Sequence, residues 1–240
     1  MRVAICLSGQ TRNWMGCGDT IKNHIIKPLN ADVFIHTWTI KGEKVINEAT
    51  GDYIPPPTPM VGDVMEFYKP KLSITEVPDY DKFRKIHPNR YYNILMQHYS
   101  IWRANQLKTE YENTNNMKYD LVIRCRFDLE IHKFDIVDTL PNIVDTIYLP
   151  PNENIDIKFN EGMKMELEMF GIRYMPNDQL AYGSSEGMDY YSSLWEIESN
   201  NISTYGNHAE GSYTDHLWNK NLSKFKADNN PNILMKIFRG

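Results

Sequence analysis

Charged and apolar residues alternate in the segment YDLVIRCRFDLEIH, residues 119–132. The charged members of the alternation are Arg124, Arg126, Asp128 and Glu130. Because successive side chains of a strand point to opposite sides, all four are expected on one face of an extended chain. The two acids lie two residues apart, about 7 Å by the rise of a strand, so both could coordinate one divalent cation.

Two structures are consistent with this alternation. One is an antiparallel strand with a solvated, charged face. The other is a strand that leaves the core at its carboxyl end, where open α/β sheets bind ligands. The apolar run Leu121–Ile123 before the first charge favours the second structure, because such runs are typical of strands buried on both faces.

A polar loop, LSGQTRNW, follows the first predicted strand at residues 7–14. Ser8, Gly9 and Thr11 supply small side chains and backbone amides. Arg12 supplies a planar cation that can bind two oxygens at once. This combination suits a pyrophosphate or a nucleotide base, whereas the alternative is a plain turn with one arginine. The loop matches neither GxGxxG nor GxxxxGK[ST], which argues against a dinucleotide-dependent oxidoreductase and a P-loop kinase.

The segment FIHTW places His36, Thr37 and Trp38 at the carboxyl end of the second predicted strand. Taken alone, a histidine here is more often a structural hydrogen-bonding group, and a tryptophan more often packs in the core. However, this strand is predicted to end at the same sheet edge as the polar loop and the acidic segment. Three polar clusters on one edge favour a binding site.

A further carboxylate, Asp178, lies in the segment MPNDQLAYGSSEGMDYY, residues 175–191. Such a group could accept a proton from an attacking hydroxyl as a general base, and the alternative is that it caps a turn. The later segment NHAEGSYTDHLW lacks the HExxH spacing of a zinc protease, and the chain has no GxSxG elbow. A glycosidase needs only two carboxylates, so motifs do not exclude it.

Local patterns predict alternating strands and helices. Strands are expected at residues 3–7, 31–38, 72–77 and 146–149, and helices at 19–29, 61–68 and 93–112. The first two strands flank a helix, so they are expected to be parallel. A strand within residues 173–182 should run into a helix capped by Ser184 or Ser185. Beyond residue 200 the patterns favour a helix at 216–222 and leave the apolar tail ILMKIF unassigned.

The composition suits one soluble domain. The chain has 240 residues, of which 41% are hydrophobic and 24% charged, enough for one large core. Its net charge of -5 argues against a nucleic-acid or anionic-membrane partner. No apolar window is long enough for a membrane span, the amino terminus lacks a signal-peptide pattern, and three cysteines without a CxxC pair fit a cytoplasmic location.

Four motifs in sequence order, LSGQTRNW, ADVFIHTW, YDLVIRCRFDLEI and NDQLAYGSSEGMDYYSSLW, resemble a known enzyme family. These are the nucleotide-diphospho-sugar glycosyltransferases with the GT-A fold, of the type found in bacterial polysaccharide clusters and in large DNA viruses such as the chloroviruses. The resemblance covers about Val3 to Trp195. Its most specific parts are the FIHTW strand end and the RxRFDLE segment, because an Asp-x-Asp signature alone is short and common.

The resemblance implies an α/β fold with an open, mostly parallel twisted sheet flanked by helices on both faces. It implies a single Rossmann-like domain over residues 1–240, in which residues 1–132 bind the nucleotide and residues 133–240 face the acceptor. For a viral protein the location would be the host cytoplasm. The activity implied is transfer of a sugar from a nucleotide-diphosphate donor, with UDP as the nucleotide, to a glycan hydroxyl.

The resemblance also assigns roles to individual residues. The donor pocket would contain Ser8, Gly9, Gln10, Arg12, His36, Thr37, Trp38, Arg126 and Asp128. Asp128 and Glu130 would bind Mn²⁺ or Mg²⁺, although the second acid of the signature is usually aspartate, so the longer Glu130 weakens the expectation of a metal. Asp178 would be the acceptor-side base of an inverting enzyme. The alternative is a carbohydrate-binding or interaction module that keeps the fold without turnover.

Overall fold

The computed structural model describes residues 1–39, 45–46, 53–54, 61–79, 81, 83, 85, 92–150, 178–200, 216–217 and 226–237. Of the helix expected at 216–222, the described residues 216–217 are helical. Among the described residues, no helix combines the length and the apolar character that a membrane crossing needs.

Seven strands form one twisted sheet in the order β10-β8-β9-β6-β1-β2-β5. The strands are β1 (Val3–Gly9), β2 (Asp32–Trp38), β5 (Leu72–Glu76), β6 (Leu121–Cys125), β8 (Thr146–Leu149), β9 (Leu180–Gly183) and β10 (Lys226–Asn229). β1 pairs in parallel with β2 and with β6, β2 with β5, and β8 with β10. Only β9 runs antiparallel to its neighbours β6 and β8. The mostly parallel sheet predicted from the sequence is confirmed.

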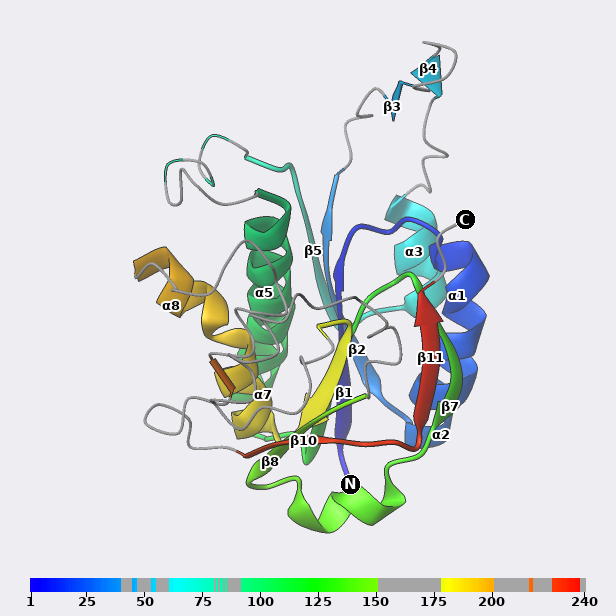
Figure 1. Ribbon diagram of the computed structural model, residues 1–240, viewed down its shortest axis with the longest axis vertical. Coiled ribbons are helices and arrows are strands. Elements are labelled where there is room, and N and C mark those ends of the chain that lie inside the picture. Colours follow the sequence, from blue (N-terminus) through cyan, green and yellow to red (C-terminus); the bar gives the residue numbers. More distant parts are fainter. Residues whose placement is uncertain are drawn as a thin grey trace, which may run out of the picture.

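Helices cover both faces of this sheet (Figure 1). On one side lie α1 (Trp14–Ile21), the π-helix η1 (Lys22–Ile26), α2 (Lys27–Leu29) and α3 (Val61–Tyr68); on the other lie α5 (Tyr92–Thr114), α7 (Ser185–Ser192) and α8 (Leu194–Asn200). The remaining elements are the pairs β3 (Val45–Ile46) with β4 (Tyr53–Ile54) and β7 (Leu129–Phe134) with β11 (Ile233–Ile237), and the 3-10 helix η2 (Val137–Asn142). The tail ILMKIF thus contributes strand β11.

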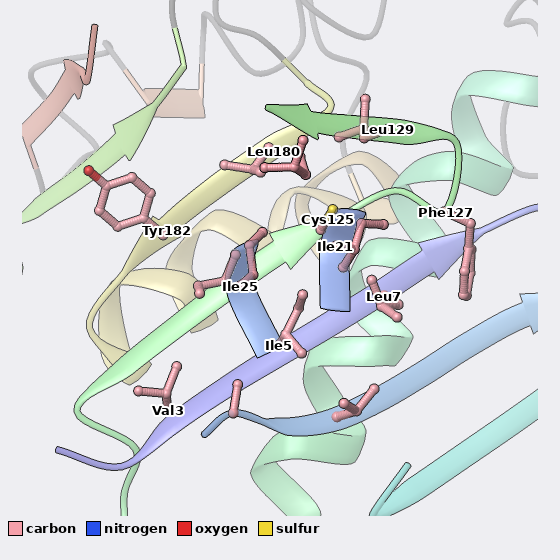
Figure 2. Close-up of a cluster of buried hydrophobic side chains, with 14 of the residues drawn as sticks. Val3, Ile5, Leu7, Ile21, Ile25, Cys125, Phe127, Leu129, Leu180 and Tyr182 are labelled. Atoms are coloured by element: carbon pink, nitrogen blue, oxygen red, sulfur yellow. The ribbon is translucent and has the colours of Figure 1, made fainter. Parts of the chain in front are cut away.

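Strand β1 alternates between two hydrophobic cores. Its residues Val3, Ile5 and Leu7 pack toward α1, and the intervening Ala4 and Cys6 pack toward α5. This is the period of two that a strand imposes, with apolar residues required on both faces because helices cover both. Figure 2 shows the first of these cores, in which residues of β1, β6 and β9 meet those of α1 and η1.

Helix α1 begins at Trp14, five residues before the predicted start. Glycines at positions 16 and 18 disfavour a helix in this segment. Packing favours Gly18, because a Cβ there would lie 2.9 Å from a ring carbon of Phe67, which would have to shift. Burial of Trp14, Cys17 and Ile21 on one side stabilises the helix despite its glycines.

Segment 119–132 forms two strands rather than one. β6 ends at Cys125, the chain turns, and β7 begins at Leu129 and pairs with β11 outside the large sheet. The turn buries Phe127 and Leu129 in the core beside α1. As a result, the four alternating charges do not share one strand face, which corrects the prediction from the alternation.

The direction of the chain across the sheet reverses at β1. From β1 the chain reaches β2 through α1 on one face, and from β5 it reaches β6 through α5 on the other face. β1 therefore lies between two parallel strands, β2 and β6, and the helices that lead to these strands lie on opposite faces of the sheet. In open α/β sheets this divergence leaves a crevice at the carboxyl ends of the strands.

Candidate functional site

A cleft of about 240 Å³ lies at the carboxyl ends of β1, β2 and β6. Its walls come from the ends of these strands, the segments that follow β1 and β6, and the start of α5. The lining residues are Ser8, Gly9, Gln10, Arg12, Trp38, Asn93, Met96, Gln97, Arg124, Arg126 and Asp128. Three arginines and one carboxylate give this lining a formal charge of +2, whereas the whole chain carries -5. The cleft is therefore suited to an anion.

The loop after β1 is held against the end of β2. Gly9 has a φ of 110°, a left-handed value that favours glycine. Its carbonyl oxygen accepts a hydrogen bond of 2.8 Å from Thr37 Oγ1. Thr37 thus positions the loop, although it is not a lining residue of the cleft.

Arg126 and Asp128 form a bidentate ion pair in the turn after β6. Arg126 Nε donates to Asp128 Oδ1 at 2.8 Å, and Nη2 donates to Oδ2 at 2.7 Å. Burial by itself would lower the pKa of Arg126, but the hydrogen bonds to Asp128 and the charges of Asp128 and Asp178 outweigh it and raise that pKa. Arg126 is a permanent cation, and both oxygens of Asp128 are engaged.

Asp178 contacts side chains of the cleft wall but does not itself line the cleft. It is buried, its Oδ2 accepts a hydrogen bond of 2.5 Å from Gln97 Nε2, and its backbone oxygen accepts one from Arg124 Nη1. Gln97 and Arg124 line the cleft, and Asp178 does not. The carboxylate expected to act as a base therefore orients Gln97 in this structure, and the backbone carbonyl of the same residue orients Arg124.

Two buried donors in the cleft wall have no hydrogen-bond partner within the described part of the chain. They are Ser8 Oγ and Arg124 Nε, and each residue is 2% exposed. An unsatisfied buried polar group costs about 1–3 kcal/mol, so such groups in a native wall call for a partner. Oxygen atoms of an anionic ligand would satisfy both.

His36 lies beside the cleft in the core. Its Nδ1 shares a 2.7 Å hydrogen bond with Ser100 Oγ. Its ring packs edge-on against Trp38, with the ring centroids 4.8 Å apart. Burial lowers the pKa of His36 to about 3, and the charge of Arg103 contributes. Glu76 Oε1, 3.8 Å from Nε2, opposes this shift, but the imidazole is fully buried and stays neutral. His36 packs Trp38 and is not a lining residue.

This environment predicts an acid sensitivity. Between pH 6.5 and about 3, unfolded chains protonate His36 and folded ones do not, so stability falls as pH falls through that window. When the pH falls from about 7 to about 5, the free energy of unfolding of wild type should decrease by about 1–2 kcal/mol more than that of His36→Asn. Urea denaturation at both pH values measures this difference. Equal losses in the two proteins would contradict the assignment of a neutral, buried imidazole.

The two acids expected to bind a cation are apart. Asp128 lines the cleft, whereas Glu130 is on β7, opposite Lys236 of β11 and 3.9 Å from His132 Nε2. Within the described ranges, no three His, Cys, Asp or Glu side chains cluster as a metal site would require. With both oxygens of Asp128 already paired, the described residues do not fit a preformed cation site.

Four lining residues were not among the predicted site residues. Asn93, Met96 and Gln97 occupy the first turns of α5, and Arg124 is the last but one residue of β6. The alternation of charge in segment 119–132 was a signal for Arg124. The α5 residues carry no local signal, because only the packing of α5 on β1 and β2 brings them to the cleft.

A solved structure similar to this chain is that of core-mannan synthase A from Aspergillus fumigatus, in its Mn/GDP form. The TM-score is 0.47 and the sequence identity 12%, over 98% of this chain and 74% of that chain. No protein-family model matches the sequence, and no curated protein matches it. A likeness this distant says nothing about activity.

Proposed function

We propose that this protein is a glycosyltransferase that moves a sugar from a nucleoside-diphosphate donor to a glycan hydroxyl. The observation that carries the proposal is the pair of unsatisfied buried donors, Ser8 Oγ and Arg124 Nε, in a positively charged cleft at the carboxyl ends of β1 and β6. The motifs of these segments are those that resemble the GT-A glycosyltransferases. UDP is the nucleotide that this resemblance favours.

The chemistry of such a transfer needs the groups found here. A nucleoside diphosphate leaves only if its growing negative charge is compensated, and fixed cations in a cleft are effective because they need no reorganisation. Arg12, Arg124 and Arg126 are the groups proposed to compensate that charge. In this proposal residues 1–132 bind the donor and residues 133–240 face the acceptor.

Asp178 remains the proposed base of an inverting reaction. Its Oδ2 is covered by Gln97 Nε2, so an acceptor hydroxyl would have to take the place of that amide before it could give up a proton. Arg124, which donates to the backbone of Asp178, would keep the carboxylate in position while Gln97 moves.

A carbohydrate-binding or interaction module without turnover is the second candidate. The hydrogen bond that Gln97 donates to Asp178 and the position of Glu130 outside the cleft favour this second candidate. A panel of UDP-, GDP- and dTDP-sugars separates the two, with nucleotide release measured in EDTA and in Mn²⁺. An enzyme hydrolyses its own donor slowly above the buffer rate. A module releases nucleotide from none of them, and that outcome would remove the transferase proposal.

Ser8 offers a direct test of the donor site. Its Oγ has no hydrogen-bond partner among the residues that the structure describes, so Ser8→Ala should leave the melting temperature unchanged or slightly raised. If the hydroxyl binds the donor, the same variant should weaken nucleotide binding about 3–10-fold, the effect of one hydrogen bond. Differential scanning fluorimetry and calorimetric titration give both values. Unchanged binding would place the ligand elsewhere.

A further inference from the structure

Among the described residues that line the cleft, positive groups outnumber negative groups before any cation is added. Arg12, Arg124 and Arg126 face one carboxylate, Asp128. A diphosphate carries several negative charges, and guanidinium groups bind phosphate oxygens two at a time. We infer that the arginines hold the diphosphate directly, so that nucleotide binding does not require a divalent cation. This inference rests on the proposed function.

The state of Asp128 is the first support. A cation at this site would need a carboxylate oxygen, yet both oxygens of Asp128 accept hydrogen bonds from the Arg126 guanidinium at 2.7 and 2.8 Å. The Asp128 side chain is 8% exposed, and charge-assisted pairs in such surroundings are strong. A cation would have to share these oxygens with the Arg126 guanidinium, whose positive charge would repel it.

The position of Glu130 is the second support. Cation sites next to phosphates use one or two carboxylates, and the segment Arg126–Glu130 offers two in its sequence. The turn between β6 and β7 separates them, so Glu130 projects from a strand of the small sheet and does not line the cleft. Only the carboxylate that Arg126 already holds remains in the described wall.

The start of α5 is the third support. Asn93 and Gln97, from the first turns of this 23-residue helix, line the cleft. The amino end of a helix carries a partial positive charge and attracts phosphate groups. It lines the same cleft as Arg124, whose unsatisfied Nε is buried in the wall. Both features supply positive charge without a metal ion.

Calorimetric titration of the full chain with UDP and GDP, in EDTA and in Mn²⁺, tests this inference. We expect one nucleotide to bind with a Kd that differs by less than about threefold between the two conditions, under 1 kcal/mol. Binding that appears only with Mn²⁺, or that Mn²⁺ tightens more than about tenfold, would overturn the inference and leave the proposed function standing. No binding of any nucleoside diphosphate in either condition would overturn the proposed function itself.

The variant Asp128→Asn distinguishes diphosphate binding by arginines alone from binding through a cation held by Asp128. If arginines bind the diphosphate, loss of the competing carboxylate frees Arg126, and nucleotide affinity in EDTA should stay equal or rise by up to about tenfold. If a cation bound to Asp128 is required, affinity in Mn²⁺ should fall by more than about tenfold. Glu130→Gln is the matched control, and it should change neither value. The wild-type titration decides the question if Asp128→Asn does not fold.

The variant Arg126→Ala removes the cation of the Arg126–Asp128 pair and keeps the carboxylate. It should weaken nucleotide binding in EDTA by at least about 30-fold, as expected when one partner of a partly buried charge pair is removed. It also frees both oxygens of Asp128, so Mn²⁺ should restore part of the lost affinity in this variant but not in wild type. An Arg126→Ala protein that folds and binds as wild type in EDTA would contradict the inference.

Discussion

Lys108→Met is expected to lower the free energy of unfolding by about 3–5 kcal/mol, the cost of removing one member of a buried ion pair. The Lys108 side chain is fully buried in α5 and contacts Glu112 Oε2 at 3.2 Å, Asp189 Oδ1 at 2.8 Å and Ser185 Oγ at 2.7 Å. Without the lysine, the fully buried Glu112 loses a cation that compensates its charge.

Glu112 is charged in the folded protein. Burial by itself would raise the pKa of Glu112, but hydrogen bonds from Tyr119 N, Lys118 and Ser185, with the charge of Lys108, outweigh it and lower that pKa. The network ties α5 to the start of α7 and to the residues before β6. Its function is therefore structural, and none of its members lines the cleft.

Lys118→Met is the matched control. Lys118 Nζ contacts the same Glu112 oxygen at 2.9 Å, but its side chain is 62% exposed, so its loss should cost less than about 1 kcal/mol. Urea denaturation of both variants measures the difference. Equal effects of the two substitutions would show that burial of Lys108 is not what makes the pair important.

Arg126→Met is expected to reduce donor turnover in EDTA by about 100–1000-fold, as does the loss of one preorganised electrostatic contact. The guanidinium is fixed by its bidentate contact with Asp128 and lines the cleft beside Arg124. Beyond the weaker nucleotide binding, kcat should also fall, because the charge of the leaving diphosphate is greatest in the transition state.

Two further variants sharpen this prediction. Arg126→Lys keeps the charge but not the two-pronged contact, so it should retain an intermediate rate. Arg12→Met removes an exposed cation of the same cleft and should have a smaller effect. Nucleotide release with the donor found in the panel is the measurement. If Arg126→Met folds and keeps turnover within about tenfold of wild type, Arg126 does not stabilise the leaving group.

The sequence predicted the sheet well where local patterns are set by burial on both faces. The runs at β1 and β2 have to be apolar on both sides because helices cover both faces, and their parallel pairing follows from the helix between them. The cap of α7 also followed from local chemistry, since Ser184 Oγ accepts from Gly187 N at 3.1 Å.

The sequence predicted the site less well where tertiary contacts decide. Strict alternation in segment 119–132 resembled one strand, but a turn that buries Phe127 and Leu129 sends Glu130 into another sheet. The polarity of Thr37 indicated a ligand contact, whereas its hydroxyl supports Gly9. Gln97 lines the cleft because α5 packs across β1 and β2. No local sequence pattern predicts where α5 packs on the sheet.

The cleft at the carboxyl ends of β1 and β6 is proposed to hold the diphosphate of the donor. A crystal structure of the protein with the nucleoside diphosphate selected by titration, grown in EDTA, tests it most directly. We expect phosphate oxygens within hydrogen-bond distance of Ser8 Oγ and of the Arg124 and Arg126 guanidinium groups. A nucleotide bound away from these three side chains would contradict it.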